Sequence, residues 1–398
     1  MTDVTIVVPT VGRPCLGRLF AALAPNPSAP VPPARVLVVD DRTDPDDPLA
    51  VPDWVTVLPG DGRGPAAARN IGWRAARHEW VVFLDDDVVP GPQWLDDLAA
   101  DLAAVSDDVG GVQGELRVPL PDRRPTDWER VTAGLADGAW LTADMAYRRA
   151  ALARVGGFDE RLPRAFREDA ELAHRVRRSG WSLRRGTRRT THPVRPEDPW
   201  VSVRCQRGNA DDALLRRLYG RRWRDVLELP AGRRHRHAAI TAAALTAAGA
   251  TLAALATGNH RWRGLAVLAA AAWGAGTAEF AAARIVPGPR DRREVLTMLA
   301  TSAVIPPLAV THWLRGWWTW RGERPLPVTA RAAGRRAEPI SLPPEPISLP
   351  PEPAMPRPPA VRPDRASRPA ARSEAGPRPA PARPNPFRSW APSAGAVR

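Results

Sequence analysis

Asp85, Asp86 and Asp87 follow directly on the apolar run WVVFL of residues 80–84. A buried strand that ends in carboxylates brings negative charge to the carboxyl edge of a sheet, where open α/β sheets bind ligands. Clustered carboxylates repel one another unless a cation lies among them, and such oxygen-rich sets suit Mg²⁺ or Mn²⁺ with phosphate as a further ligand. The run therefore predicts a metal-diphosphate site. The competing interpretation is a solvated acidic turn.

A second acidic pair, Asp40 and Asp41, ends another apolar run in the same way. Apolar strands separated by helical patterns are typical of a mostly parallel sheet that is covered on both faces. Right-handed crossovers bring all the strand ends to one edge, so the two acidic turns should meet there. The predicted strands are 4–8, 35–39, 55–58 and 80–84, and the predicted helices are 15–24, 65–77 and 94–105.

Residues 110–194 show a less regular pattern. They contain a helix candidate at 150–155, the turn GGFDE at 156–160 and a helix start at Glu168-Asp169. Glycine 180 should end the body of that last helix, residues 171–179. His192 follows in the run THP.

The net charge of +14 is unevenly distributed along the 398 residues. Residues 1–200 hold 26 Arg and 30 acidic residues (net −4), which leaves 31 Arg and 13 acidic residues (net +18) for the remainder. A basic region suits nucleic acid or an anionic membrane surface. With only Cys15 and Cys205, no disulfide framework or cysteine metal site is expected.

Three apolar segments, 238–257, 264–286 and 295–314, favour the membrane over nucleic acid. An uncharged stretch of about 20 residues is long enough to cross a bilayer, although an alanine-rich one also suits a buried bundle helix. Arginines before the first segment and between the second and third place those ends on the cytoplasmic side. Pro306-Pro307 should break the third segment, which either crosses the bilayer or lies along its surface.

The last part of the chain is rich in proline: 20 of the 46 prolines lie from Pro325 onward, and EPISLPP repeats at Glu338 and Glu345. Such a composition cannot build a core and predicts a disordered tail. The expected organisation is therefore an α/β catalytic domain (1–200), a basic amphipathic connector (201–235), a membrane region of two or three helices (236–322) and a Pro/Arg-rich disordered tail (323–398).

The order of these motifs resembles the family 2 glycosyltransferases of the GT-A fold, of the bacterial membrane-associated type. The resemblance covers about residues 3–195. It is carried by VVPT (7–10), VVDD (38–41), GPAAARNIG (64–72), FLDDD (83–87), GGFDE (156–160), RED (167–169) and THP (191–193).

The resemblance implies a role for each matching residue on the donor side. Thr10, Asp40 and Asp41 should bind the base and ribose of a nucleotide-diphospho-sugar, and Asp86 should also contribute to binding this donor. Arg69 should lie near the nucleotide phosphates, and Asn70 should brace its loop.

Asp85 and Asp87 form the Asp-x-Asp motif, with Asp87 as a direct ligand of Mn²⁺ or Mg²⁺ and Asp85 reaching ribose or metal-bound water. His192 either completes the metal site or makes a structural bond at a strand end.

Asp169 is the candidate catalytic base on the acceptor side. Its alternative role is that of an acid stabilised by a helix N-terminus. Glu168 should support the turn by pairing with Arg164 or Arg167. Asp144 stands where relatives often carry a smaller neutral polar residue, which would alter the acceptor side.

The expected activity is inverting, metal-dependent glycosyl transfer to an acceptor hydroxyl. The expected location is a bacterial inner membrane, with the catalytic domain in the cytoplasm. Confinement of the catalytic domain to the membrane favours a lipid-linked or cell-envelope acceptor, although a soluble acceptor stays open. Nucleic acid is not expected as a partner. The alternatives are a GT-A nucleotidyltransferase that makes an activated sugar, and a non-catalytic membrane scaffold.

Overall fold

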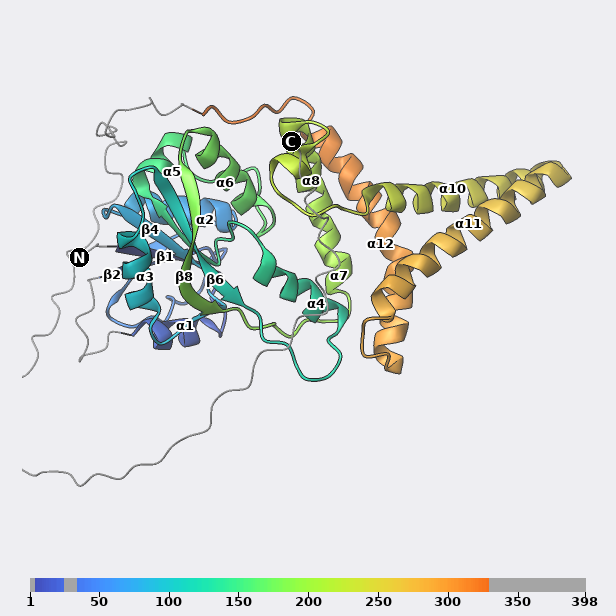
Figure 1. Cartoon of the computed structure of the whole chain (residues 1–398). Coiled ribbons are helices and arrows are strands. Elements are labelled where there is room, and N and C mark those ends of the chain that lie inside the picture. Colours follow the sequence, from blue (N-terminus) through green and yellow to red (C-terminus); the bar gives the residue numbers. More distant parts are fainter. Residues whose placement is uncertain (1–3, 25–33, 329–398) are drawn as a thin grey trace, which may run out of the picture. The chain divides into compact units, whose positions relative to one another are not determined.

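The computed structural model of the chain describes residues 4–24 and 34–328 (Figure 1). These residues belong to the first of two units, which covers residues 1–354. The disordered tail expected over 323–398 lies, from residue 329 onward, outside the described residues.

An eight-stranded sheet forms the centre of the N-terminal part, in the order β3-β2-β1-β4-β7-β6-β8-β5. The strands are β1 (Val4–Thr10), β2 (Ala34–Asp40), β3 (Val55–Pro59), β4 (Trp80–Leu84), β5 (Val89–Pro90), β6 (Val109–Arg117), β7 (Asp144–Arg148) and β8 (Ser182–Thr191).

The first half of the sheet is parallel, as the sequence predicts. β1 pairs in parallel with β2 and with β4, and β2 pairs in parallel with β3. Thr10 lies opposite Asp40 in the register of β1 and β2. The carboxyl ends of β1, β2 and β4 therefore meet at one edge of the sheet.

The second half is mixed. β7 lies antiparallel between β4 and β6, β8 pairs in parallel with β6, and the short β5 pairs antiparallel with β8. β8 has no apolar alternation because its sequence, SLRRGTRRTT, contains four arginines. It was therefore not predicted as a strand. The fold class, an α/β domain with a mostly parallel sheet followed by a helical region, is confirmed.

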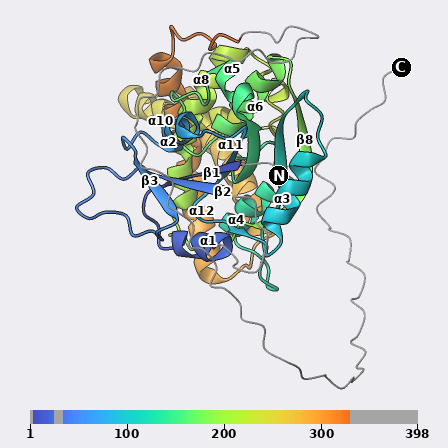
Figure 2. The same cartoon turned by 90° about the vertical axis from the view of Figure 1, so that its left-hand side faces the viewer.

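Helices cover both faces of the sheet (Figure 2). Side chains of α1 and α3 share one buried cluster with Ile6, Val8 and Val82, whereas those of α2, α5 and α6 share another with Val7 and Phe83. The period of two in a strand explains why neighbouring residues enter opposite cores. The helices are α1 (Leu16–Leu23), α2 (Pro65–Ala75), α3 (Trp94–Ala103), α4 (Asp127–Ala133), α5 (Arg149–Val155) and α6 (Glu168–Arg178).

Short helices link the sheet to the C-terminal region. Leu214, Leu215 and Leu218 of α8 form a third apolar cluster with Leu162, which lies between α5 and α6. The linking elements are η1 (Gly134–Asp137), α7 (Val201–Arg204), η2 (Cys205–Gly208), α8 (Asn209–Tyr219) and α9 (Trp223–Val226).

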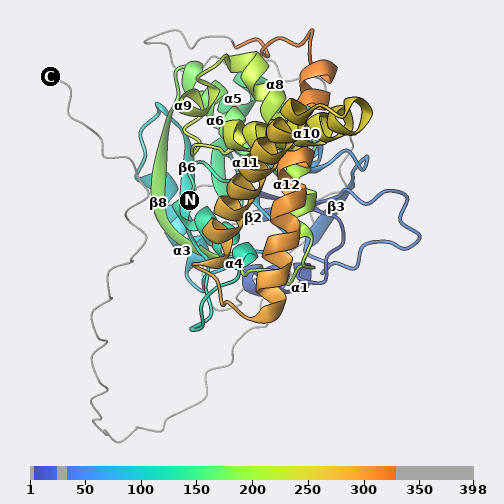
Figure 3. The same ribbon diagram turned by 90° about the vertical axis from the view of Figure 1, so that its right-hand side faces the viewer.

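Three long helices complete the described chain: α10 (Arg234–Thr257), α11 (His260–Ile285) and α12 (Arg292–Thr319). Each is long and apolar enough to cross a membrane (Figure 3). The expected break at Pro306-Pro307 is wrong, because α12 continues through both prolines. A proline inside a helix removes one backbone hydrogen bond and usually bends the helix, and here packing of α12 on its neighbours holds the helical path.

Candidate active site and metal centre

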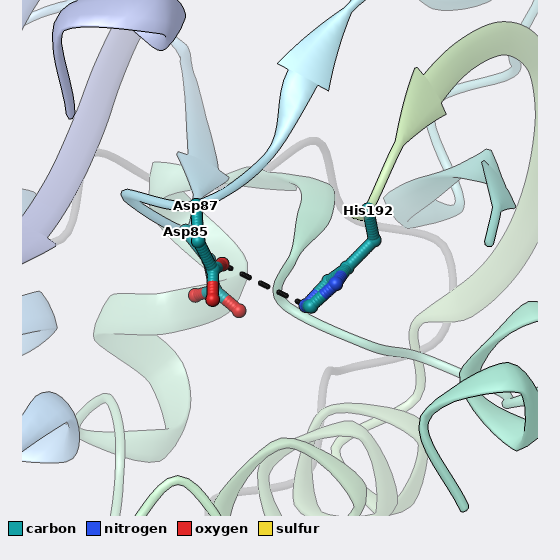
Figure 4. A group of neighbouring side chains, drawn as sticks. All are labelled: Asp85, Asp87 and His192. Atoms are coloured by element: carbon teal, nitrogen blue, oxygen red, sulfur yellow. Dashed lines mark ion pairs between the residues drawn. The ribbon is translucent and has the colours of Figure 1, made fainter. Parts of the chain in front are cut away.

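Asp85, Asp87 and His192 come together at the carboxyl edge of the sheet (Figure 4). Each offers one ligand atom, and these atoms lie within 4.8 Å of one another. The aspartates follow β4, whereas His192 follows β8, more than 100 residues later in the chain. The end of β8 is held close by the pairing of Thr191 with Val89 of β5.

The charges of this cluster suit a divalent cation. His192 Nε2 lies 3.6 Å from Asp87 Oδ1, and Arg195 Nε lies 3.1 Å from Asp87 Oδ2. Burial, and next the charge of Asp85, raise the pKa of Asp87, while His192 and Arg195 lower it. Two carboxylates and an imidazole are suitable ligands for Mn²⁺, and a cation would relieve the repulsion between the carboxylates. The residues present therefore fit the expected metal.

Asp86 has different partners from Asp85 and Asp87. Its carboxylate is buried and accepts hydrogen bonds from Thr10 Oγ1 (2.6 Å) and Arg13 Nη1 (2.5 Å). Thr10 Oγ1 in turn accepts a hydrogen bond from the backbone N–H of Gly12 (3.0 Å). Thr10 and Asp86 thus join the ends of β1 and β4 and fix the loop that follows β1.

Asp40 and Asp41 are close in sequence but differ in their partners. Asp40 forms a two-pronged pair with Arg42, and these hydrogen bonds lower the pKa of Asp40. Asp41 accepts a hydrogen bond from the backbone N–H of Gly64 (2.8 Å), and burial raises its pKa. Its second oxygen, Oδ1, is buried without a hydrogen-bond partner among the described residues. Buried polar atoms are normally satisfied, so Asp41 Oδ1 is suited to accept from a ligand.

Arg69 is buried and lies between two carboxylates. Its Nη2 donates to Asp85 Oδ1 (2.7 Å), and its Nη1 donates to Glu168 Oε1 (2.8 Å). The expected partner of Glu168 was Arg164 or Arg167, and this is wrong. Arg164 instead pairs with Asp211, and Arg167 lies near Asp212. Arg167, the residue before α6, has a left-handed backbone conformation (φ 76°). Its side chain lies near Asp212 and does not pair with Glu168.

Asn70 braces the GGFDE turn. Its Nδ2 donates to Phe158 O (2.9 Å) and Glu160 Oε1 (2.8 Å), and its Oδ1 accepts from Phe158 N and Trp73 Nε1 (both 2.8 Å). All the hydrogen-bonding capacity of this amide is used. Gly157 has φ 80°, and a Cβ there would lie 2.3 Å from Asn70 Oδ1, so the close approach requires glycine.

Asp169 lies at the start of α6, beside the buried Glu168. Its Oδ1 accepts from the backbone N–H of Ala170 (2.7 Å), and its side chain is partly exposed. No hydrogen bond within the described residues involves its Oδ2. Burial raises the pKa of Asp169 most, and the nearby charge of Asp85 raises it further, while Arg69 and Arg167 lower it. Its neighbour Glu168 is joined to Asp85 through Arg69, which links the start of α6 to the end of β4.

Asp144 is a structural residue in this fold. Its fully buried carboxylate accepts from Arg188 Nε (2.7 Å), Trp94 Nε1 (2.7 Å) and Thr190 Oγ1 (2.6 Å). Asp144 is therefore held in the core, and its expected effect on the acceptor side stays a prediction. Sequence inspection missed Arg188 and its second partner, Asp101, because two buried charges in separate elements leave no local pattern.

Residues 5–150 match the family model described as glycosyl transferase family 2. A curated relative, the pre-mycofactocin glycosyltransferase of Mycobacterium tuberculosis (strain CDC 1551 / Oshkosh), is 31% identical over 204 residues, which cover 46% of this chain and 40% of that protein. The chain thus spans less than half the length of this relative. The match over residues 5–150 confirms the resemblance for this segment.

Two solved structures show a more distant likeness. The mannosyltransferase PcManGT of Pyrobaculum calidifontis, in complex with GDP-Man and Mn²⁺, is 20% identical, with a TM-score of 0.46 over 80% of this chain and 88% of that one. Glucosyl-3-phosphoglycerate synthase of Mycobacterium tuberculosis, in complex with Mn²⁺, UDP-Glc and phosphoglyceric acid, is 17% identical, with a TM-score of 0.36 over 58% and 81%. Both TM-scores are below 0.5, so no substrate is inferred from them.

Proposed function

We propose, from the family 2 match of residues 5–150, that the chain is an inverting, metal-dependent glycosyltransferase at the cytoplasmic face of a membrane. It transfers a sugar from a nucleotide-diphospho-sugar to an acceptor hydroxyl. The observation that carries the proposal is the convergence of Asp85, Asp87 and His192 at the sheet edge where β2 ends before Asp41. Arg69 links Asp85 at this edge to Glu168, the neighbour of Asp169.

The donor nucleotide is proposed to bind along the ends of β1 and β2. Asp41 Oδ1, which has no partner among the residues described, accepts an N–H or O–H from the base or ribose. Asp40 contributes a ribose contact beside Arg42, and Thr10 with Asp86 holds the adjoining loop in place. In this arrangement Arg69 acts mainly by orienting Asp85 and Glu168, with its guanidinium close to the nucleotide.

The metal is proposed to bind through Asp85, Asp87 and His192. A bound divalent cation neutralises the charge that develops on the departing diphosphate. Asp87 and His192 are held facing one another by β4 and β8, and Arg69 occupies one oxygen of Asp85, which leaves its second oxygen for the cation or for ribose. This donor set is suited to Mn²⁺ or Mg²⁺.

Asp169 is proposed as the catalytic base. Its Oδ2 takes the proton of the acceptor hydroxyl while the acceptor oxygen bonds to the anomeric carbon and the bond from that carbon to the diphosphate breaks. The bonding electron pair leaves with the diphosphate. Glu168 is less suited to this step because Arg69 holds its Oε1 at 2.8 Å and its side chain is buried.

The domain boundaries of the proposal follow the sequence: a catalytic domain over 1–200, a connector over 201–235, a membrane region over 236–322 and a tail from 323. Three helices that are apolar enough to span a membrane support the attachment. The proposed location is a bacterial inner membrane. A catalytic domain confined to its surface favours a lipid-linked or cell-envelope acceptor.

The test is a screen of nucleotide sugars with the full-length protein and Mn²⁺. Release of nucleoside diphosphate from a sugar donor is the expected result. Formation of pyrophosphate from a nucleoside triphosphate and a sugar phosphate would support the nucleotidyltransferase alternative instead. That alternative gains no support from the loop after β1, because its Arg13 is paired with Asp86. An absence of metal-dependent nucleotide binding in calorimetry would favour a scaffold.

A further inference from the structure

Helix α12 contacts α4 near its start and α8 of the connector near its end. Near its start, Glu294 Oε1 accepts a hydrogen bond from the backbone N–H of Asp127 in α4 (3.0 Å). Near its end, Arg217 of α8 lies 4.2 Å from the ring centroid of Trp317 and donates to Trp317 O (3.3 Å). A helix of 28 residues is about 42 Å long, so α12 lies along the domain over a distance greater than the thickness of a bilayer core.

The middle of α12 is also joined to the domain. Arg284 of α11 is buried and donates to Thr301 Oγ1 (2.8 Å) and Ser302 Oγ (3.1 Å) of α12. Its other terminal nitrogen donates to Asp127 Oδ2 (2.8 Å) and to Ser202 Oγ of α7 (2.9 Å). A polar seam around Arg284 thus joins the middle of α12 to α4 and α7, while the rest of the buried face of α12 is mostly apolar.

The opposite face of α12 is exposed and apolar. Exposed fractions are 54% for Leu296, 59% for Leu314 and 69% for Trp318. The spacing of the stripe is that of one helix face, and in water such a face would carry charged side chains. With Thr311 as the one polar member, the stripe consists of Leu296, Ala300, Val304, Pro307, Thr311, Leu314 and Trp318.

Basic residues flank α12 on both sides. Arg290, Arg292 and Arg293 surround its start, and Arg315, Arg321 and Arg324 surround its end. A helix that spanned the membrane would carry one of these groups to the far side, against the positive-inside rule. A helix that lies flat keeps both groups at the headgroups of anionic lipids.

α10 and α11 have a different character. They pack against each other, and each carries exposed apolar side chains, such as Leu252 (68%) and Leu268 (70%). At the base of the pair, Glu279 of α11 accepts from Arg236 Nη1 (2.8 Å) and also pairs with Arg233. Two arginines, Arg261 and Arg263, follow the turn between α10 and α11. At the other end of the pair there are six (residues 233, 234, 236, 290, 292 and 293).

We propose that α12 does not span the membrane. It lies flat in the interface of an anionic bilayer with the Leu296–Trp318 face in lipid, while α10 and α11 enter the bilayer as a hairpin. The chain then returns to the catalytic side, so residues 320–328 are on the same side as the active site. This inference rests on the membrane attachment proposed above, but not on the reaction.

The direct test measures the depth of nitroxide labels by electron paramagnetic resonance. Full-length protein with Cys15→Ala and Cys205→Ala is labelled at Leu296→Cys, Val304→Cys or Leu314→Cys, in phosphatidylcholine/phosphatidylglycerol vesicles. The matched reference is Leu245→Cys, at the middle of α10, where the native side chain is 70% exposed. We expect similar, shallow depths for the three α12 labels and a greater depth for the α10 label.

A label at Val304 that is much deeper than those at Leu296 and Leu314 would overturn the proposal, and so would three labels fully accessible to water. Protein that does not sediment with vesicles would instead contradict the membrane attachment itself, whatever its activity.

Alkaline phosphatase fusions provide an independent check in a bacterial host. The reporter is inserted between Gly258 and Asn259 or fused after Arg398. We expect activity for the insertion in the turn and no activity for the C-terminal fusion, with expression of both verified by immunoblot. An active C-terminal fusion would mean that α12 crosses the membrane.

Discussion

Arg69 joins Asp85 and Glu168, with its two terminal nitrogens 2.7 and 2.8 Å from their respective carboxylates. One buried guanidinium therefore links the acidic edge of β4 to the start of α6, where the proposed base lies.

Replacing Arg69 with Met should both destabilise the protein and abolish turnover. Removing one partner of a buried ion pair costs about 3–5 kcal/mol, because the remaining charge stays buried without compensation. Thermal unfolding and diphosphate release measure the two effects. Arg74→Met on the same helix is the matched control, since Arg74 is 41% exposed and lies 3.7 Å from Glu160. Equal stability of the two variants would contradict the structural role of Arg69.

Asp169→Asn should lose turnover while retaining nucleotide binding and stability. The asparagine Oδ1 can still accept from the N–H of Ala170, but the side chain cannot take a proton. General-base catalysis contributes about 10²–10⁴-fold, so a loss of that size is expected in diphosphate release, with unchanged binding in calorimetry. The base assignment is wrong if this variant turns over normally.

The metal-free protein should become less stable as the pH rises from about 4.5 to about 7. Burial, and next the charge of Asp169, raise the pKa of Glu168 from 4.5 to about 7, although Arg69 lowers it. In that window the folded chain holds a proton that the unfolded chain has lost, so the free energy of unfolding falls with pH. Thermal unfolding in EDTA at several pH values measures the slope. Glu168→Gln should flatten it, and an unchanged slope would refute the assignment to Glu168.

His192→Ala should weaken Mn²⁺ binding without unfolding the domain. Substitution of residues that only support the metal ligands lowers metal affinity by about 10–100-fold. Loss of one of the three protein ligands should lower it by at least as much. Calorimetry with Mn²⁺ alone measures this effect independently of any sugar donor. His260→Ala, at the exposed turn between α10 and α11, is the control. Identical Mn²⁺ affinity for both variants would place the metal elsewhere.

Asp144→Asn should cost far more stability than Glu115→Gln. Asp144 pairs with Arg188, and both side chains are fully buried, so about 3–5 kcal/mol is expected for breaking this pair. Glu115 pairs with Arg189 at the surface, where both side chains are about half exposed, and such pairs contribute about 0–1 kcal/mol. Unfolding temperatures compare the two variants, and a small effect at Asp144 would contradict its role in the core.

The parallel half of the fold and its acidic edge were predictable because their signals are local. Apolar runs that end in Asp40 and Asp85 mark strand ends, and the parallel pairing of β1 with β2 and β4 brings them to one edge. The roles assigned to these residues stay predictions. Asp40 and Asp85 are close because their strands are the two parallel neighbours of β1. Apolar runs separated by helical patterns indicate such a parallel arrangement.

The rest depended on contacts between distant segments. The partner of Glu168 is 99 residues away in the chain, whereas the predicted partners were close in sequence. In the sequence of β8, Arg188 cannot be distinguished from the exposed arginines beside it. Its side chain belongs to the core because it pairs with Asp101 and Asp144. Local propensity predicted a break in α12 at Pro306, but the tertiary environment decided otherwise.

The seam made by Arg284 has a practical consequence for the preparation of a water-soluble version of this protein. A shortened chain that stops before α10 would strip Asp127 of its Arg284 partner and remove Trp320 from the apolar cluster around Leu214 and Leu218. The C-terminal helices are therefore part of the support of the catalytic domain and not a detachable anchor. Detergent or nanodisc preparations of the whole chain are the better starting material for measuring its activity.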